Sequence, residues 1–164
     1  MPEVKDELNL EASDENLDRV LDFVDGYMER YGCDQSVQLA VDVAVEELFV
    51  NIAHYAYTPE RGSARVGLEI REPRTIIISF TDQGKQYDPL AKPDPDLTLP
   101  VEERPIGGLG IYMVKQSMDK VTYTYENKSN ILTIQKNMTE GKNVNDRFNA
   151  VVSRVEEMLE PGEG

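Results

Sequence analysis

The chain has 164 residues, 40% of them hydrophobic, and a formal net charge of −14. These values are typical of one globular domain, and the acidic balance argues against direct nucleic-acid binding, which uses Lys and Arg to neutralise phosphates. The single Cys33 excludes an internal disulfide and a cysteine zinc cluster, and one histidine argues against a His-rich metal site. The sequence has no apolar run of about 18 residues and no secretory signal, so we expect a cytoplasmic protein without a membrane span.

The first third of the chain predicts one strand and two helices. Residues 3–11 contain a short apolar alternation, which indicates an edge strand. Apolar residues then recur at helical spacing between Ser13, a candidate cap, and Gly32, a candidate stop. A second helix is expected from about Asp34 to about Tyr57, with an apolar stripe wide enough to cover a sheet.

Two β-hairpins are predicted further along the chain. Residues 64–72 and 75–82 alternate on either side of a turn, and the second of these strands is the more apolar and so the more central. Residues 121–125 and 131–133 form the second hairpin, around an expected turn at 127–130. Strands paired in hairpins with helices between them favour an α+β two-layer sandwich, in which helices cover one sheet.

The remaining segments are a long loop and a C-terminal extension. Residues 88–105 contain five of the nine prolines and no periodic apolar pattern, which is typical of a functional lid or a disordered segment. We expect one domain over residues 1–137 and an extension over 138–164, with a helix at about 145–160. The apolar stripe of that helix would pack against its own domain or against a second copy or a partner, and the sequence leaves both open.

The predicted second helix carries two polar residues among apolar neighbours. Glu47 and Asn51 are four residues apart, so they lie on the same helical face. A carboxylate and an amide oxygen can hold magnesium or position a reacting hydroxyl group. A helix edge that faces water is the alternative explanation for this pair.

Two glycine-containing segments add candidate ligand contacts. Asp82 ends the most apolar strand, where its carboxylate can accept a hydrogen bond from an exocyclic amine, and Gly84 would let a flat ring approach. Gly107, Gly108 and Gly110 precede a short helix, and N–H groups at a helix start favour phosphate. The alternatives are a turn aspartate and an ordinary glycine-rich helix start, and the sequence has no Walker-type loop.

Taken in chain order, these motifs resemble the GHKL ATP-binding fold shared by histidine kinases, type II topoisomerases and MutL-like proteins. The similarity covers roughly residues 5–137, and it is greatest to the anti-sigma-factor serine/threonine kinases, the bacterial switch kinases of that superfamily. It implies a Bergerat-type sandwich with a mixed, mainly antiparallel sheet, and it makes residues 88–105 the ATP lid. The small size and the lack of an upstream phosphoacceptor helix pair favour a switch kinase over a sensor histidine kinase.

The resemblance assigns roles to individual residues. It makes Glu47 the general base for a serine or threonine hydroxyl, and Asn51 the ligand of a magnesium ion that bridges the ATP phosphates. It makes Asp82 the reader of the adenine amino group, with Gly84 beneath the ring. The other nucleotide-binding positions it implies are Tyr87, Arg104, Gly107, Gly108, Leu109, Gly110 and Ile111.

The chain also departs from the family pattern. The family often places a histidine four residues after the asparagine, whereas His54 lies three residues after Asn51. We expect His54 to be a structural histidine at the helix end, with a phosphate contact as the alternative. Ser129 and Asn130 stand where the family usually has a Gly-Thr pair, which leaves a threonine contact with adenine without a counterpart.

The resemblance implies an ATP- and Mg²⁺-dependent protein serine/threonine kinase that acts as an anti-sigma regulatory factor. Its expected partners are a sigma factor or another regulator and a STAS-like antagonist, which it would phosphorylate, and a homodimer is the usual arrangement. Two alternatives are an ATP-binding anti-sigma or adaptor module without kinase activity, and the catalytic half of a split histidine kinase.

Overall fold

The computed structural model describes residues 4–57, 60–72, 74–91, 98, 109–139 and 152–156. The strands are β1 (Val4–Glu11), β2 (Ser63–Arg71), β3 (Thr75–Asp82), β4 (Lys120–Glu126) and β5 (Ser129–Asn137). The α-helices are α1 (Leu17–Arg30), α2 (Gln35–Asn51) and α3 (Leu109–Ser117). Short helical turns lie at η1 (Asp14–Asn16), η2 (Ile52–Ala56) and η3 (Pro89–Ala91).

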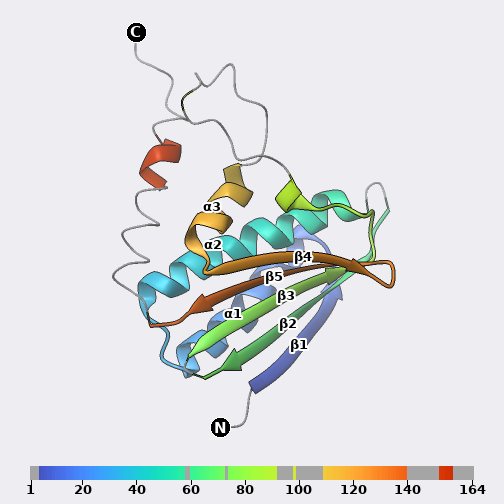
Figure 1. The fold of residues 1–164 in the computed structure, drawn as a ribbon. Coiled ribbons are helices and arrows are strands. Elements are labelled where there is room, and N and C mark those ends of the chain that lie inside the picture. Colours follow the sequence, from blue (N-terminus) through green and yellow to red (C-terminus); the bar gives the residue numbers. More distant parts are fainter. Residues whose placement is uncertain are drawn as a thin grey trace.

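The five strands form one antiparallel sheet in the order β1-β2-β3-β5-β4. This order confirms the edge position predicted for the first strand and the central position predicted for residues 75–82. Helices α1, α2 and α3 lie together on one face of the sheet (Figure 1). The α+β two-layer architecture is therefore confirmed.

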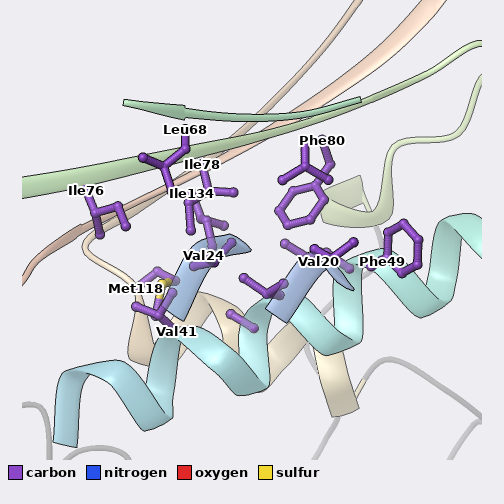
Figure 2. Packing of buried hydrophobic residues seen from close by; sticks show 14 of the residues in the cluster. Val20, Val24, Val41, Phe49, Leu68, Ile76, Ile78, Phe80, Met118 and Ile134 are labelled. Carbon is purple, nitrogen blue, oxygen red and sulfur yellow. The ribbon is translucent and has the colours of Figure 1, made fainter. Parts of the chain in front are cut away.

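The hydrophobic core lies between the sheet and the helices (Figure 2). Alternate residues of β2 and β3 are buried, as a strand with one covered face requires. Ile78 and Phe80 point from β3 toward Val20 of α1 and Phe49 of α2, and each of these side chains is at most 1% exposed. Burial on this scale accounts for the apolar stripes of the first two helices.

The ends of the first helix differ in how well the sequence predicts them. Gly32 follows α1 with φ of 71°, the left-handed conformation that glycine adopts readily, so the predicted stop is confirmed. Ser13 makes no side-chain cap; instead its backbone carbonyl accepts a 3.0 Å bond from the Asn16 N–H at η1.

The second helix changes geometry before its predicted end. We expected one regular helix to about Tyr57, but α2 stops at Asn51 and continues as the wide π-helical turn η2. The carbonyl of Ala56 in this turn accepts a 2.9 Å hydrogen bond from the Lys85 N–H, just beyond β3. This partner outside the helix ties η2 to the segment after the central strand.

The second hairpin has a tighter turn than the sequence predicts. Asn127 and Lys128 have φ values of 51° and 63°, and a two-residue turn with positive φ matches the twist of paired strands. Ser129 and Asn130, expected in the turn, belong to β5 instead. Asn130 thereby becomes a buried strand residue, 7% exposed.

Parts of the expected lid and C-terminal extension lie outside the described residues. In the extension, residues 152–156 are helical, and Val152 packs against the hydrophobic core. The domain boundary and the full helix at 145–160 stay predictions. Among the described residues, no helix has the length and apolar character needed to cross a membrane.

Candidate functional site

A cavity of about 740 Å³ lies where α2, η2, α3 and the ends of β3 and β5 meet. Its volume is in the range usual for small-molecule sites. Most lining residues are apolar or aromatic, with a few polar groups and one lysine among them. They are Glu47, Leu48, Asn51, Ile52, Tyr55, Ala56, Phe80, Asp82, Lys85, Gln86, Tyr87, Pro89, Gly110, Ile111, Tyr123, Asn130 and Leu132.

Glu47 and Asn51 share one wall of this cavity, as their helical spacing predicts. The Asn51 amide Nδ2 donates a 3.4 Å hydrogen bond to Glu47 Oε1. Burial raises the pKa of the Glu47 carboxyl group, the bond from Asn51 lowers it, and the charge of Glu46 raises it again. A carboxylate with a raised pKa inside a cavity is a candidate proton acceptor.

Gly110, at the start of α3, lies directly against this pair. A Cβ atom at residue 110 would stand 2.0 Å from Cδ and Oε1 of Glu47. Only glycine leaves room for the carboxylate there. The glycine segment and the helix pair, 63 residues apart in the chain, thus meet at one point.

Asp82, the last residue of β3, also lines the cavity. The residue is 6% exposed. Its Oδ1 accepts a 2.9 Å hydrogen bond from the Gly84 N–H and a 3.0 Å hydrogen bond from Asn130 Nδ2. Asp82 and Asn130 face each other in the register of β3 and β5. The carboxylate is therefore held firmly at the end of the central strand, where it lines the cavity.

Asn130 is a site residue to which sequence analysis assigned no role. Its Nδ2 also donates a 2.8 Å hydrogen bond to the Lys85 carbonyl. Its Oδ1 accepts one hydrogen bond from the Tyr87 N–H, at 3.1 Å, and another from the Tyr123 hydroxyl group. The sequence does mark this position, because Asn130 stands where the family usually has a Gly-Thr pair. Its contacts could not be read from the sequence, because they depend on the pairing of β5 with β3.

Gly84 lies beside the cavity but not among its lining residues. A Cβ atom there would stand 2.2 Å from the Ala56 carbonyl oxygen, so close packing against η2 explains the glycine. A position beneath a bound ring stays a prediction. Tyr87 and Ile111 line the cavity, and Leu109 begins α3.

Three predicted phosphate contacts, Arg104, Gly107 and Gly108, lie outside the described residues, as does most of the lid. His54 is described and does not line the cavity. Its Nε2 lies 2.7 Å from Oδ2 of Asp14, at the start of η1. This pairing across two helical segments fits the structural role expected of the histidine.

The donor set suits magnesium better than a transition metal. No group of three or more His, Cys, Asp or Glu side chains able to hold a metal occurs in the described ranges. Asn51 Nδ2 is turned to Glu47, which leaves the amide oxygen as a ligand. Magnesium commonly takes one or two protein oxygens and completes its shell with phosphates and water, so the residues present fit it.

The family description of a histidine kinase-like ATPase domain matches residues 10–136. This stretch includes every residue that lines the cavity. It also includes the sheet, apart from most of β1 and the last residue of β5.

Three curated relatives are similar to the chain. The serine-protein kinase RsbW of Halalkalibacterium halodurans is 30% identical over 119 residues, which are 70% of this chain and 72% of the relative. RsbW of Bacillus cereus is 29% identical over 94 residues, 55% of this chain and 58% of the relative. The serine/threonine-protein kinase BtrW of Bordetella bronchiseptica is 25% identical over 60% of this chain and 69% of its own.

Two solved structures share the fold. The RsbU and RsbW domains of a Mycobacterium tuberculosis protein match 84% of this chain and 33% of theirs, with 14% identity and a TM-score of 0.58. The histidine kinase domain of a blue-light activated kinase from Erythrobacter litoralis matches 80% of this chain and 64% of its own, with 14% identity and a TM-score of 0.51. The family match over most of the chain and the relative at 30% identity show that this chain belongs to the histidine kinase-like ATPase domain family.

Proposed function

We propose that the chain is an ATP-dependent protein serine/threonine kinase that acts as an anti-sigma regulatory factor. Membership of an ATPase domain family implies the use of ATP. The relatives at 25–30% identity are named serine-protein or serine/threonine-protein kinases, which supports a hydroxyl group as the phosphate acceptor.

The observation that carries the proposal is the position of Glu47. Its half-buried carboxylate lies in the same cavity as Asp82, next to Asn51 and in contact range of Gly110. A carboxylate whose pKa is raised by burial holds a proton more readily than a surface glutamate. The cavity thus combines a nucleotide-sized space with a proton acceptor.

Phosphoryl transfer from ATP to a protein hydroxyl group needs positioning and one proton acceptor. The hydroxyl oxygen forms a bond to the γ-phosphorus as the bond to the bridging oxygen of ADP breaks, and Glu47 takes the hydroxyl proton. Asp82, which lines the same cavity, binds the adenine amino group and so orients the nucleotide. Glu47 returns its proton to water after the product leaves.

Magnesium would be held by the Asn51 amide oxygen together with phosphate oxygens, and it would supply neutralisation of the phosphate charge. Asn51 then has two tasks at once. Its oxygen would be a ligand of the metal, and its Nδ2 keeps the Glu47 carboxylate in place through the 3.4 Å bond.

The proposed acceptor is a STAS-type antagonist protein, and the proposed regulatory target is a sigma factor. The similar Mycobacterium tuberculosis structure contains an RsbW domain together with an RsbU domain, which supports a place among regulatory proteins. We also propose that the chain forms a homodimer and that it acts in the cytoplasm, where sigma factors act.

The test is phosphate transfer to a candidate antagonist. The purified chain is incubated with labelled ATP, magnesium and a STAS-domain protein encoded in the same genome, and we expect acid-stable phosphoserine or phosphothreonine on the antagonist. Nucleotide binding without transfer would instead indicate an adaptor module, and acid-labile phosphate would indicate a split histidine kinase. Pull-down from the native cell with mass spectrometry identifies the partners.

A further inference from the structure

We propose that Asn130 is a positioning residue that makes the cavity select adenine over guanine. This inference rests on the proposed function only in requiring that the cavity bind ATP through Asp82. It assigns a role to a residue that the family pattern marks only as a departure from a Gly-Thr pair and that the relatives' names do not point to.

The orientation of the Asn130 amide is fixed by its neighbours. The Tyr87 backbone N–H can only donate, so it identifies the Asn130 oxygen, at 3.1 Å. The Lys85 backbone carbonyl can only accept, so it identifies the Asn130 nitrogen, at 2.8 Å. The Tyr123 hydroxyl group also donates to the oxygen, which leaves Nδ2 to donate to Asp82.

This fixed amide occupies one oxygen of Asp82. Oδ1 accepts from Asn130 Nδ2 at 3.0 Å and from the Gly84 N–H at 2.9 Å. Within the described part of the chain, both hydrogen bonds to the Asp82 carboxylate end on Oδ1. Since Asp82 is 6% exposed and lines the cavity, Oδ2 is the oxygen left for a ligand.

A single available acceptor suits adenine better than guanine. Adenine presents one exocyclic amino group, which one carboxylate oxygen satisfies. Guanine presents two adjacent donors, N1–H and the 2-amino group, which pair best with both oxygens of a carboxylate. Asn130 denies the second oxygen to guanine and leaves one of its donors without a partner, which is costly in a buried site.

The test compares binding of the magnesium complexes of adenosine and guanosine imidotriphosphates by calorimetry. Asn130→Ala removes one of the two donors to Oδ1 and leaves the Gly84 N–H in place, so Oδ1 can accept one hydrogen bond from a ligand. We therefore expect the ratio of guanine to adenine dissociation constants to fall about 10-fold, the size of one hydrogen bond. Tyr123→Phe removes only one donor that orients the amide, and it should lower the ratio about 3-fold in a fully folded protein.

Thr133→Val is the matched control. Thr133 lies on the opposite face of β5, where its hydroxyl group is 3.2 Å from that of Ser79, so the change removes a hydrogen bond in the same strand without reaching the cavity. Its ratio should stay within about 2-fold of the parent value.

The outcomes separate the two proposals. If the parent chain binds the adenine nucleotide and Asn130→Ala weakens both nucleotides equally, Asn130 only supports the fold and this inference is wrong. An unchanged ratio in Tyr123→Phe overturns it as well when Asn130→Ala does not fold. If the parent chain binds neither nucleotide, the proposed function fails and the inference fails with it.

Discussion

Gly110 and Glu47 lie so close that a methyl group at residue 110 would overlap the glutamate carboxyl group. The overlapping atoms are at the end of a flexible side chain, so Glu47 can move away without disturbing the backbone. The fold therefore tolerates a larger residue at this position, whereas the placement of the carboxylate does not.

We expect Gly110→Ala to leave the free energy of unfolding within about 1 kcal/mol of the parent and to lower phosphate transfer by about 10-fold or more. Gly84→Ala is the contrasting variant, because its Cβ would stand 2.2 Å from the Ala56 carbonyl oxygen, a backbone atom. It should destabilise the fold by about 2 kcal/mol. Chemical denaturation and a transfer assay on both variants check this, and equal losses of stability would contradict it.

Glu47→Ala should lower phosphate transfer by about 100-fold or more and leave nucleotide affinity nearly unchanged, because the side chain is proposed to act on the acceptor hydroxyl group. Glu126→Ala is the control, since Glu126 of β4 is exposed, does not line the cavity and does not shift the pKa of Glu47. Transfer by Glu47→Ala at the parent rate would show that another group takes the proton.

The rate should also depend on pH in a way set by Glu47. Only the ionised carboxylate accepts a proton, and burial raises the pKa of Glu47. A plot of kcat against pH should therefore fall on its acid side at a pH above the usual pKa range of glutamate.

Asn51→Ala should remove the gain in nucleotide affinity that magnesium provides, because the amide oxygen is the proposed metal ligand. Calorimetry with magnesium and with a chelator gives the two affinities for each protein. Asn16→Ala is a matched amide control, since the Asn16 side chain bonds the Glu11 carbonyl at the start of the helical layer and lies outside the cavity. A full magnesium effect in Asn51→Ala would remove the metal assignment.

Asp25 of α1 and Asp42 of α2 form a carboxyl pair that makes stability depend on pH. Burial, a hydrogen bond to Asp25 and the charges of Asp25 and Glu29 raise the pKa of Asp42 from 3.8 to about 8. The folded chain keeps a proton that the unfolded chain releases, so this contribution to stability is complete below about pH 4 and is lost as the pH rises toward 8.

Asp42→Asn should therefore be more stable than the parent at pH 8, by about 1–2 kcal/mol after allowance for partial exposure, and the difference should shrink toward pH 4. Asp22→Asn, an exposed change of equal charge on α1, should show no such trend. Thermal unfolding between pH 4 and 8 checks this, and parallel profiles for parent and Asp42→Asn would count against the shared proton.

The sequence predicts those parts of the molecule whose signal is local. Alternating burial in β2 and β3 and the four-residue spacing of Glu47 and Asn51 are both read within one element. The π-helical turn escaped prediction because the partner of the Ala56 carbonyl is Lys85, on another segment. Asn130 escaped for the same reason, because its importance comes from facing Asp82 across two strands.

The sheet order has a consequence for synthesis on the ribosome. In the part of the chain that the structure describes, β5 is the last strand of the sheet to be synthesised, and it pairs with both β3 and β4. Until β5 is inserted, Asp82 sits on an open sheet edge and lacks Asn130, its partner 48 positions later. The adenine contact proposed for Asp82 therefore requires synthesis to have passed β5, because a chain truncated before residue 129 lacks both that strand and Asn130.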